Sequence, residues 1–348
     1  MELKFWRFDL QLAHTWRIAS GGAAGTNLYP IVLVQLTDRD GRQGIGEAAS
    51  TERYGQPAEV IEAFLRKVDA SRLSFDDIPG SMLYLDSLGP GDDAAKGGIN
   101  IALVDAAARA AGKSVAEHFG VPFTEGRHLT SFSIGIDAPE VIRNKVKEAA
   151  IYPVLKLKVG SAQDRQNFAA LREAAPTKTV RVDANEAWKS KEEALGQIEW
   201  LHADGHVEFI EQPMPASSPP ADMTWLKERS PLPIFGDESY HHAPDVARAA
   251  DCFHGVNVKL VKAGGLTGAY EALQAARRAG LKTMIGCMIE SSVLITAAAH
   301  LADLTDHLDI DGNLLVRNDP YVGVTADKGR ISFALTAEKH GLRVRPRS

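Results

Sequence analysis

Residues Val154–Gly160 read VLKLKVG, and the fold of the whole chain can be worked out from this stretch. It is apolar, rich in branched residues and closed by a glycine, which is typical of a β-strand. Because side chains alternate along a strand, Lys156 and Lys158 should share one face. If that face is enclosed, charge repulsion and loss of hydration lower a lysine pKa, and a lysine becomes a base near neutral pH. The alternative is a solvated edge strand protected by lysines.

Short apolar stretches of this kind recur from about Arg127 onward, each followed by a loop and an amphipathic helical pattern. Asp137, Ser161 and Ser190 are expected to be helix N-caps, and Glu193 should complete a capping box. The predicted strands are Thr130–Ile134, Val154–Val159, Val180–Asp183, Val207–Ile210, Ile234–Gly236, Gly255–Val258, Thr283–Gly286 and His307–Ile310. Eight such units predict an α/β fold, a modified TIM or (β/α)8 barrel over residues 127–314.

The residues on either side of this repeat follow a different pattern. Residues 1–126 combine strand-like stretches, a hairpin turn at Asp38–Gly41 and two helical patterns, which predicts an α+β capping domain. Strand-like residues return at 315–348, so the C-terminal tail is expected to complete that domain. The small, glycine-rich segment Ser20–Asn27 is expected to be a loop.

The composition excludes several classes of protein. The net charge of −6 and the lack of a basic stripe argue against a nucleic-acid partner. No run of 18 apolar residues is present, so no membrane span is expected. Cys252 and Cys287 cannot build a disulfide framework, and the N-terminus lacks the apolar core of a signal peptide. These features predict a cytoplasmic location.

Three acidic residues follow three successive predicted strands. Asp183 ends the third strand, Glu211 follows the fourth and Asp237 follows the fifth. The carboxyl ends of parallel strands meet at one mouth of a barrel, so these side chains should converge there. Three carboxylates would repel one another without a cation, and a set of oxygen ligands suits Mg²⁺. Singly, each acid could be an N-cap or an exposed loop residue, but their common register favours a magnesium site.

Lys259 lies on the sixth predicted strand, four units after Lys158. The second and sixth strands of an eight-stranded barrel face each other across the mouth. Amino groups on opposite sides of a metal site could move a proton from one face of a carbon to the other. The alternative is a surface lysine, and Lys262, which lies past the strand, is expected to be one. Gly264–Gly265 could alternatively form an anion-binding turn.

Taken in order, these motifs resemble those of the enolase superfamily, muconate-lactonizing subgroup. The matching motifs are Lys156-x-Lys158, Asp183-Ala-Asn185, Glu211-Gln-Pro213, Gly236-Asp237-Glu238-Ser239, Asn257-Val-Lys259-Leu and Lys262-Ala-Gly264-Gly265. The resemblance covers nearly the whole chain. It implies removal of a proton α to a carboxylate, with Mg²⁺ on the three acids stabilising an enediolate.

The resemblance also implies roles for the surrounding side chains. Lys158 would act as acid or base on one face of the α-carbon, and Lys259 on the other. Lys156 would keep the pKa of Lys158 low. Asn185 and Glu238 would contact the metal ligands.

Asp309-Ile310-Asp311, on the eighth predicted strand, is similar to the Asp-x-Asp pair of dipeptide epimerases, which binds the free α-ammonium of the substrate. Strand alternation puts both carboxylates on one face, and charge-assisted hydrogen bonds to an ammonium are strong. A surface acidic loop is the alternative. The sequence therefore predicts an epimerase that inverts the α-carbon of the C-terminal residue of a dipeptide.

The N-terminal loop bears on which dipeptide is used. Epimerases specific for alanyl-glutamate place an arginine in this loop, whereas here Arg17 precedes an uncharged tip. Arg17 remains a candidate substrate contact, and a small or apolar second residue is expected.

Two other interpretations stay open. The same lysine pair could serve N-acylamino acid racemisation, o-succinylbenzoate synthesis or cycloisomerisation, which need no ammonium pocket. A non-catalytic barrel would need no opposed lysines. A homo-oligomer is an expectation by analogy alone.

Overall fold

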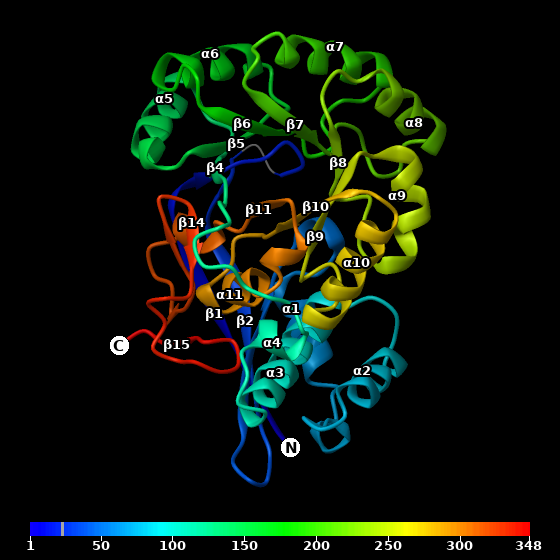
Figure 1. The fold of residues 1–348 in the computed structure, drawn as a ribbon, viewed down its shortest axis with the longest axis vertical. Helices are drawn as coiled ribbons and strands as arrows, with labels where there is room; N and C mark the ends of the chain where they lie inside the picture. The colour runs from blue at the N-terminus through cyan, green and yellow to red at the C-terminus, as the bar shows by residue number, and fades with distance from the viewer. Residues whose placement is uncertain (22–23) are drawn as a thin grey trace.

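The computed structural model describes residues 1–21 and 24–348, and it has two parts (Figure 1). The predicted loop Ser20–Asn27 includes residues 22–23, which lie outside the described residues. One part is an antiparallel sheet of β1 (Glu2–Trp16), β2 (Thr26–Thr37) and β3 (Gln43–Ala49), in that order. Its helices are α1 (Ala58–Leu65), α2 (Ile78–Ser87), α3 (Asp93–Ala110) and α4 (Val115–His118). This arrangement confirms the predicted α+β capping domain.

The buried helix α3 packs directly onto strand β3. Glycines make this close approach possible: a Cβ at Gly44 would lie 1.9 Å from the Ala102 carbonyl oxygen, and one at Gly46 would lie 2.0 Å from that of Gly98. The chain breaks between α3 and α4, where Gly112 adopts a φ of 65°.

The second part is an eight-stranded parallel sheet whose strands follow one another in sequence order. Its strands are β4 (Phe132–Ile134), β5 (Val154–Lys158), β6 (Thr179–Asp183), β7 (Val207–Glu211), β8 (Ile234–Gly236), β9 (Gly255–Lys259), β10 (Lys282–Gly286) and β11 (His307–Asp309). A parallel bridge between Thr130 and Leu308 closes the sheet. The predicted barrel is confirmed, with strand ends that differ from the predicted ones by at most two residues.

Helices follow the strands and cover the outside of the barrel, and the earlier of them form the green to yellow arc in Figure 1. They are α5 (Pro139–Glu148), α6 (Asp164–Ala174), α7 (Lys191–His202), α8 (Pro220–Arg229), α9 (Val246–Cys252), α10 (Leu266–Arg278) and α11 (Ser292–Ala299). Within the described residues, no helix combines the length and apolar character needed to cross a membrane.

One of the three predicted helix starts is confirmed. The Ser190 hydroxyl accepts a hydrogen bond from the Glu193 amide, although the Glu193 carboxylate accepts from the amide of Lys189 rather than from that of Ser190. Asp137 and Ser161 are not N-caps; those positions are Ala138 and Gln163. Ser161 instead donates its amide and hydroxyl to Asp164, which turns the chain before the helix begins.

The C-terminal tail returns to the N-terminal sheet. It forms two short antiparallel pairs, β12 (Tyr321–Val322) with β15 (Arg345–Pro346) and β13 (Thr325–Asp327) with β14 (Arg330–Ser332). Val316 bridges Leu12 of β1, and the Leu342 amide donates to Asp105 of α3 at 2.8 Å. The tail also bonds to the barrel side, where the Ile331 amide donates to the His128 carbonyl. The domain boundaries at residues 126 and 314 therefore stay predictions.

Candidate active site

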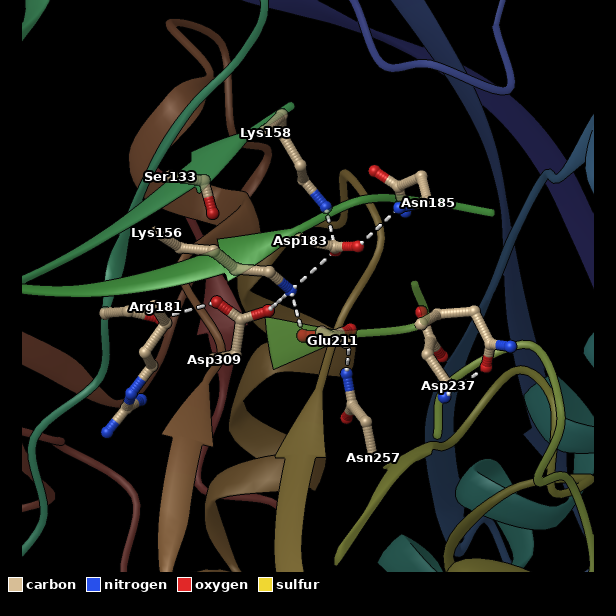
Figure 2. Close-up of polar contacts among 12 residues, drawn as sticks. Ser133, Lys156, Lys158, Arg181, Asp183, Asn185, Glu211, Asp237, Asn257 and Asp309 are labelled. Carbon is tan, nitrogen blue, oxygen red and sulfur yellow. Dashed lines mark hydrogen bonds and ion pairs between the residues drawn. The ribbon is translucent and has the colours of Figure 1, made fainter. Parts of the chain in front are cut away.

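Three carboxylates converge at the carboxyl ends of neighbouring barrel strands (Figure 2). Asp183 ends β6, Glu211 ends β7 and Asp237 directly follows β8. One oxygen of each lies within 4.8 Å of the others, and all three side chains are buried. Register explains the placement, because Asp183 pairs with Glu211 across the two strands. The convergence predicted from the strand ends is confirmed.

Lys156 lies among carboxylates from three other strands, as Figure 2 shows. Its Nζ is 2.6 Å from Asp309, 2.7 Å from Glu211 and 3.0 Å from Asp183. Burial favours the neutral amine, but the charges of Asp183, Asp309 and Glu211 outweigh it and raise the pKa of Lys156 well above its usual value. The expected lowering of lysine pKa on this face is therefore wrong for Lys156, because the acids outnumber the neighbouring lysine.

Lys158 and Lys259 approach the three acids from opposite ends. Lys158 Nζ is 2.6 Å from Asp183, and Lys259 Nζ is 2.8 Å from Asp237. The two lysines lie on β5 and β9, which are four strands apart in a closed sheet of eight. Glu211 lies between the two aspartates in strand order, so the lysines flank the acid cluster on opposite sides of the mouth.

Lys262, predicted to be a surface residue, is buried against the acid cluster. Its Nζ is 2.6 Å from Asp237 Oδ1 and also donates to the Asp237 carbonyl. Further hydrogen bonds go to the carbonyls of Tyr240 at 2.9 Å and Asn257 at 3.2 Å. The prediction fails because the turn after β9 folds back over the barrel mouth, and a position in sequence relative to a strand end does not reveal this.

Asp309 and Asp311 are held by serines of the neighbouring strand region. Ser131 Oγ donates to Asp309 at 2.6 Å, and the Ser133 amide donates to Asp311 at 2.6 Å. Burial and the nearby charge of Asp309 raise the pKa of Asp311 to about 7. Burial acts in the same direction on Asp309, but Lys156 outweighs it and lowers the pKa of Asp309. Both acids are therefore buried, with different charge environments.

Ser131 and Ser133 were not identified from the sequence. A usable signal was present, because Ser131-x-Ser133 has the same alternation as Lys156-x-Lys158 and Asp309-x-Asp311. The three motifs lie on adjacent parts of the closed sheet, since Phe132 pairs with Leu155 and Thr130 bridges Leu308. Three polar-x-polar strands side by side indicate a polar patch facing the barrel interior.

Asn185 hydrogen-bonds both to the acid cluster and to Glu238. The Asn185 amide donates to Asp183 at 2.9 Å, and its side-chain nitrogen donates to Glu238 at 3.3 Å. Among the described residues, Asn185 Oδ1, Glu238 Oε2 and Asn257 Oδ1 are buried without a hydrogen-bond partner. Burial and the neighbouring carboxylates raise the pKa of Glu238 to about 8. Crowded acids with free oxygens fit a hard divalent cation.

A cavity of about 500 Å³ lies between the barrel mouth and the capping domain. From the barrel it is lined by Lys158, Asn185, Glu238, Lys259, Asp309 and Asp311, and from the capping domain by Arg17, Leu28, Tyr29, Arg53 and Tyr54, among others. Both the barrel and the capping domain therefore contribute predicted site residues to the cavity. Lys156 and the three acids lie beneath the cavity floor.

The fold and this site together define a class of protein: a capped (β/α)8 barrel with a buried three-carboxylate cation site between two opposed lysines. Family models match both parts of the chain. The model described as "Enolase C-terminal domain-like" matches residues 140–344. The "Mandelate racemase / muconate lactonizing enzyme, N-terminal domain" model matches residues 16–120. The chain belongs to the mandelate racemase / muconate lactonizing enzyme family of the enolase superfamily, which confirms the resemblance.

Its similarity to characterised members is extensive. The L-Ala-D/L-amino acid epimerase of Pedosphaera parvula (strain Ellin514) is 62% identical over 345 residues, 99% of this chain and 99% of that protein. The substrate-liganded structure of the L-Ala-D/L-Glu epimerase from Bacillus subtilis matches with a TM-score of 0.92 and 25% identity, covering 100% of this chain and 99% of that one. The dipeptide epimerase from Cytophaga hutchinsonii, complexed with Mg and D-Ala-L-Val, matches with a TM-score of 0.91 and 25% identity, covering 99% and 95%.

Proposed function

We propose that this chain is a Mg²⁺-dependent dipeptide epimerase that inverts the α-carbon of the second residue. The observation that carries the proposal is the pair Lys158 and Lys259, which approach one acid cluster from opposite sides of the barrel mouth. A site for inversion needs a proton acceptor on one face of a carbon and a donor on the other. The 62% identity to an L-Ala-D/L-amino acid epimerase supports alanine as the first residue.

Asp183, Glu211 and Asp237 would hold the metal. Their oxygens lie close enough to share one ion, and the unpartnered oxygen of Glu238 is available to a ligand nearby. When bound, Mg²⁺ supplies positive charge next to the substrate carboxylate and so favours loss of the α-proton.

Lys158 and Lys259 would transfer the proton. Each is buried and hydrogen-bonded to an acid of the cluster, so each is held in a fixed position at the cavity floor. One lysine takes the proton from the α-carbon, and the other returns a proton to the opposite face. Lys156, which is surrounded by carboxylates, would serve to balance charge and hold Asp183, Glu211 and Asp309 in place.

Asp309 and Asp311 would bind the α-ammonium of the first residue. Both line the cavity, and the hydrogen bonds from Ser131 and Ser133 orient them. Asp311 makes no ion pair with a cation within the described chain, so its charge is available to a substrate ammonium. This arrangement would fix the substrate at both ends, with its second α-carbon between the lysines.

Incubation with a dipeptide library in D₂O and Mg²⁺, read by mass spectrometry, tests the function directly. We expect one deuterium to enter the α-position of the second residue in L-Ala dipeptides, with formation of the other epimer. Failure to label any dipeptide would refute the proposal. If N-acylated amino acids were labelled and the Asp311→Asn variant kept full activity, the related racemase activity would replace it. The homo-oligomeric state stays a prediction.

A further inference from the structure

Around the cavity, the cationic side chains of the described residues have ion-pair partners, but several acidic side chains do not. Every cationic side chain that lines it, within residues 1–21 and 24–348, is paired with an acid. The pairs are Lys158 with Asp183, Lys259 with Asp237, Arg17 with Asp137, and Arg53 with Glu186. Of the acids that line the cavity, Glu52, Glu238 and Asp311 have no ion-pair partner in that same part of the chain, whereas Asp309 is paired with Lys156. The cavity therefore has acidic side chains that are free to pair with a cation, whereas its own lysines and arginines are already paired.

The capping domain contributes Arg17 and Arg53 to the cavity, and Arg53 is held more firmly. Its Nε is 2.6 Å from Glu186 Oε2, and its second nitrogen donates to Glu186 Oε1 at 2.8 Å. Glu186 is itself anchored, because Oε1 also accepts from the Ala216 amide at 2.7 Å and its side chain is only 10% exposed. A two-point pair with a fixed partner costs much to break, so Arg53 does not turn readily toward a ligand.

Arg17 is held in a similar way on the other side. Its guanidinium lies 3.2 Å from Asp137 and donates to the Ala24 carbonyl at 3.3 Å. Asp137 is in turn paired with the buried Lys145 at 3.0 Å. The carbonyl of Arg17 accepts from the Ile136 amide, which ties this part of the loop to the barrel.

Apart from the arginines, Glu52 and a few small hydroxyl residues, the capping domain offers apolar and aromatic side chains to the cavity. Ile18, Leu28, Tyr29 and Tyr54 all line the cavity. Leu28 is 51% exposed, which is unusual for a large apolar side chain unless something covers it. If the substrate ammonium lies at Asp309 and Asp311 and its carboxylate at the acid cluster, the second side chain points toward this wall.

We propose that the site selects dipeptides whose second residue is uncharged and apolar, and that it rejects an acidic second residue because Glu186 and Asp137 hold the arginines that could receive it. This proposal rests on the proposed function. An acidic side chain would meet unpaired acids and, among the described residues, no unpaired cationic side chain, whereas an apolar one would cover Leu28 and the tyrosines.

The Glu186→Gln variant tests the proposal by a gain of activity. The amide can still accept from Ala216 but no longer neutralises Arg53. We expect wild-type kcat/KM for L-Ala-L-Leu to exceed that for L-Ala-L-Glu, and the variant to lower this ratio by roughly ten-fold, as one new charged contact would. The double variant Arg53→Met/Glu186→Gln should restore the wild-type ratio, because the released guanidinium is then absent.

Glu173→Gln is the matched control, because it breaks an Arg–Glu pair with Arg143 on the outside of the barrel. Its substrate ratio should equal that of the wild type. If Glu186→Gln does not fold, as judged by circular dichroism, Asp137→Asn frees Arg17 and should shift the ratio in the same direction. Equal wild-type use of both dipeptides, or an unchanged ratio in a folded variant, would overturn the inference. Absence of activity on every dipeptide would instead overturn the proposed function.

Discussion

At the scale of single residues, the barrel mouth is a set of buried charges that neutralise one another. Lys156 is 1% exposed and lies within 3.0 Å of carboxylates contributed by β6, β7 and β11. Removing one partner from such a group leaves an uncompensated buried charge, which is more costly than the pair itself is stabilising. Each charged side chain here therefore has both a chemical and a structural consequence when it is changed.

The two flanking lysines should be separable by isotope exchange. Lys158→Ala and Lys259→Ala should each lower epimerisation by at least roughly 10²-fold, because each removes the proton carrier on one face. One variant should still exchange the α-proton of the L,L epimer with solvent, and the other that of the L,D epimer. Proton NMR in D₂O measures both rates. Retention of full epimerisation by either variant would contradict a mechanism with two bases.

Lys262 should be essential for stability. Lys262→Met leaves Asp237 with one cation fewer and leaves carbonyls of Tyr240 and Asn257 without this donor. We expect the free energy of unfolding in urea to fall by about 3–5 kcal/mol. The control is Lys282→Met, which removes an exposed ion pair with Asp306. Here the free energy of unfolding should change by less than about 0.5 kcal/mol. Equal effects of the two variants would show that the contacts of Lys262 are not stabilising.

Asp311 should impose a pH dependence on substrate binding. Its pKa is raised to about 7, first by burial and then by Asp309, so the carboxylate form is lost as the pH falls through that value. Because only the charged form pairs with an ammonium, kcat/KM for a dipeptide should decline below about pH 7, where the substrate amine stays protonated. In Asp311→Asn this decline should disappear and activity should be low throughout. A wild-type profile that is flat over this range would exclude the assignment.

At the scale of elements, short strands bring together side chains that the chain separates widely. The chain in and beside β4, β5 and β11 carries an alternating polar pair in each case, and parallel pairing places these three segments side by side. The capping domain relies on close packing instead, with α3 seated on β3 through Gly44, Gly46 and Gly98. The internal packing of the capping domain thus depends on residues that have no polar side chain.

Gly46→Ala should test that packing. Its Cβ would lie 2.0 Å from the Gly98 carbonyl, so α3 must shift, and we expect a loss of about 1–3 kcal/mol in the free energy of unfolding. Gly196→Ala in α7 is the control, because nothing lies within 4 Å of its added Cβ. There a gain of about 0.5–1 kcal/mol is expected from helix propensity. Thermal melts followed by circular dichroism distinguish the two, and a stabilised Gly46→Ala would refute the packing argument.

At the scale of the whole molecule, the tail and the N-terminal sheet hold helix α11 between them. Glu47 of β3 accepts from the amide and hydroxyl of Ser291, and Asp319 of the tail accepts from the amide and hydroxyl of Ser292. These two acids satisfy free donors at the start of α11. The loop before this helix lines the cavity through Cys287 and Met288, so both ends of the chain contribute to the shape of the site.

Asp319→Ala should therefore affect the whole protein. It removes the acceptor for Ser292 and for the Tyr321 amide, and we expect a loss of about 1–3 kcal/mol with a single unfolding transition. Asp327→Ala, at the exposed end of β13, is the control and should leave the melting temperature unchanged. Differential scanning calorimetry is the measurement. Two separate transitions in the wild type, or an unchanged melting temperature in the Asp319 variant, would show that the tail does not couple the two parts.

The sequence by itself determined the barrel, the capping domain and the convergence of Asp183, Glu211 and Asp237. These follow from local rules: apolar strand periodicity and the meeting of parallel strand ends at one mouth. The same rules also placed Lys158 and Lys259 on strands that are four apart, because the strand order in this fold follows the sequence order.

Only the tertiary structure decided the partner of each charged side chain. The burial of Lys262, the pairing of Arg53 with Glu186 and the raised pKa of Lys156 each depend on residues far away in the chain. A side chain's charge state and freedom to bind are set by its neighbours in space, at distances of a few ångströms. Periodicity predicts which face a residue occupies, but it does not predict which oxygen or nitrogen will meet it there.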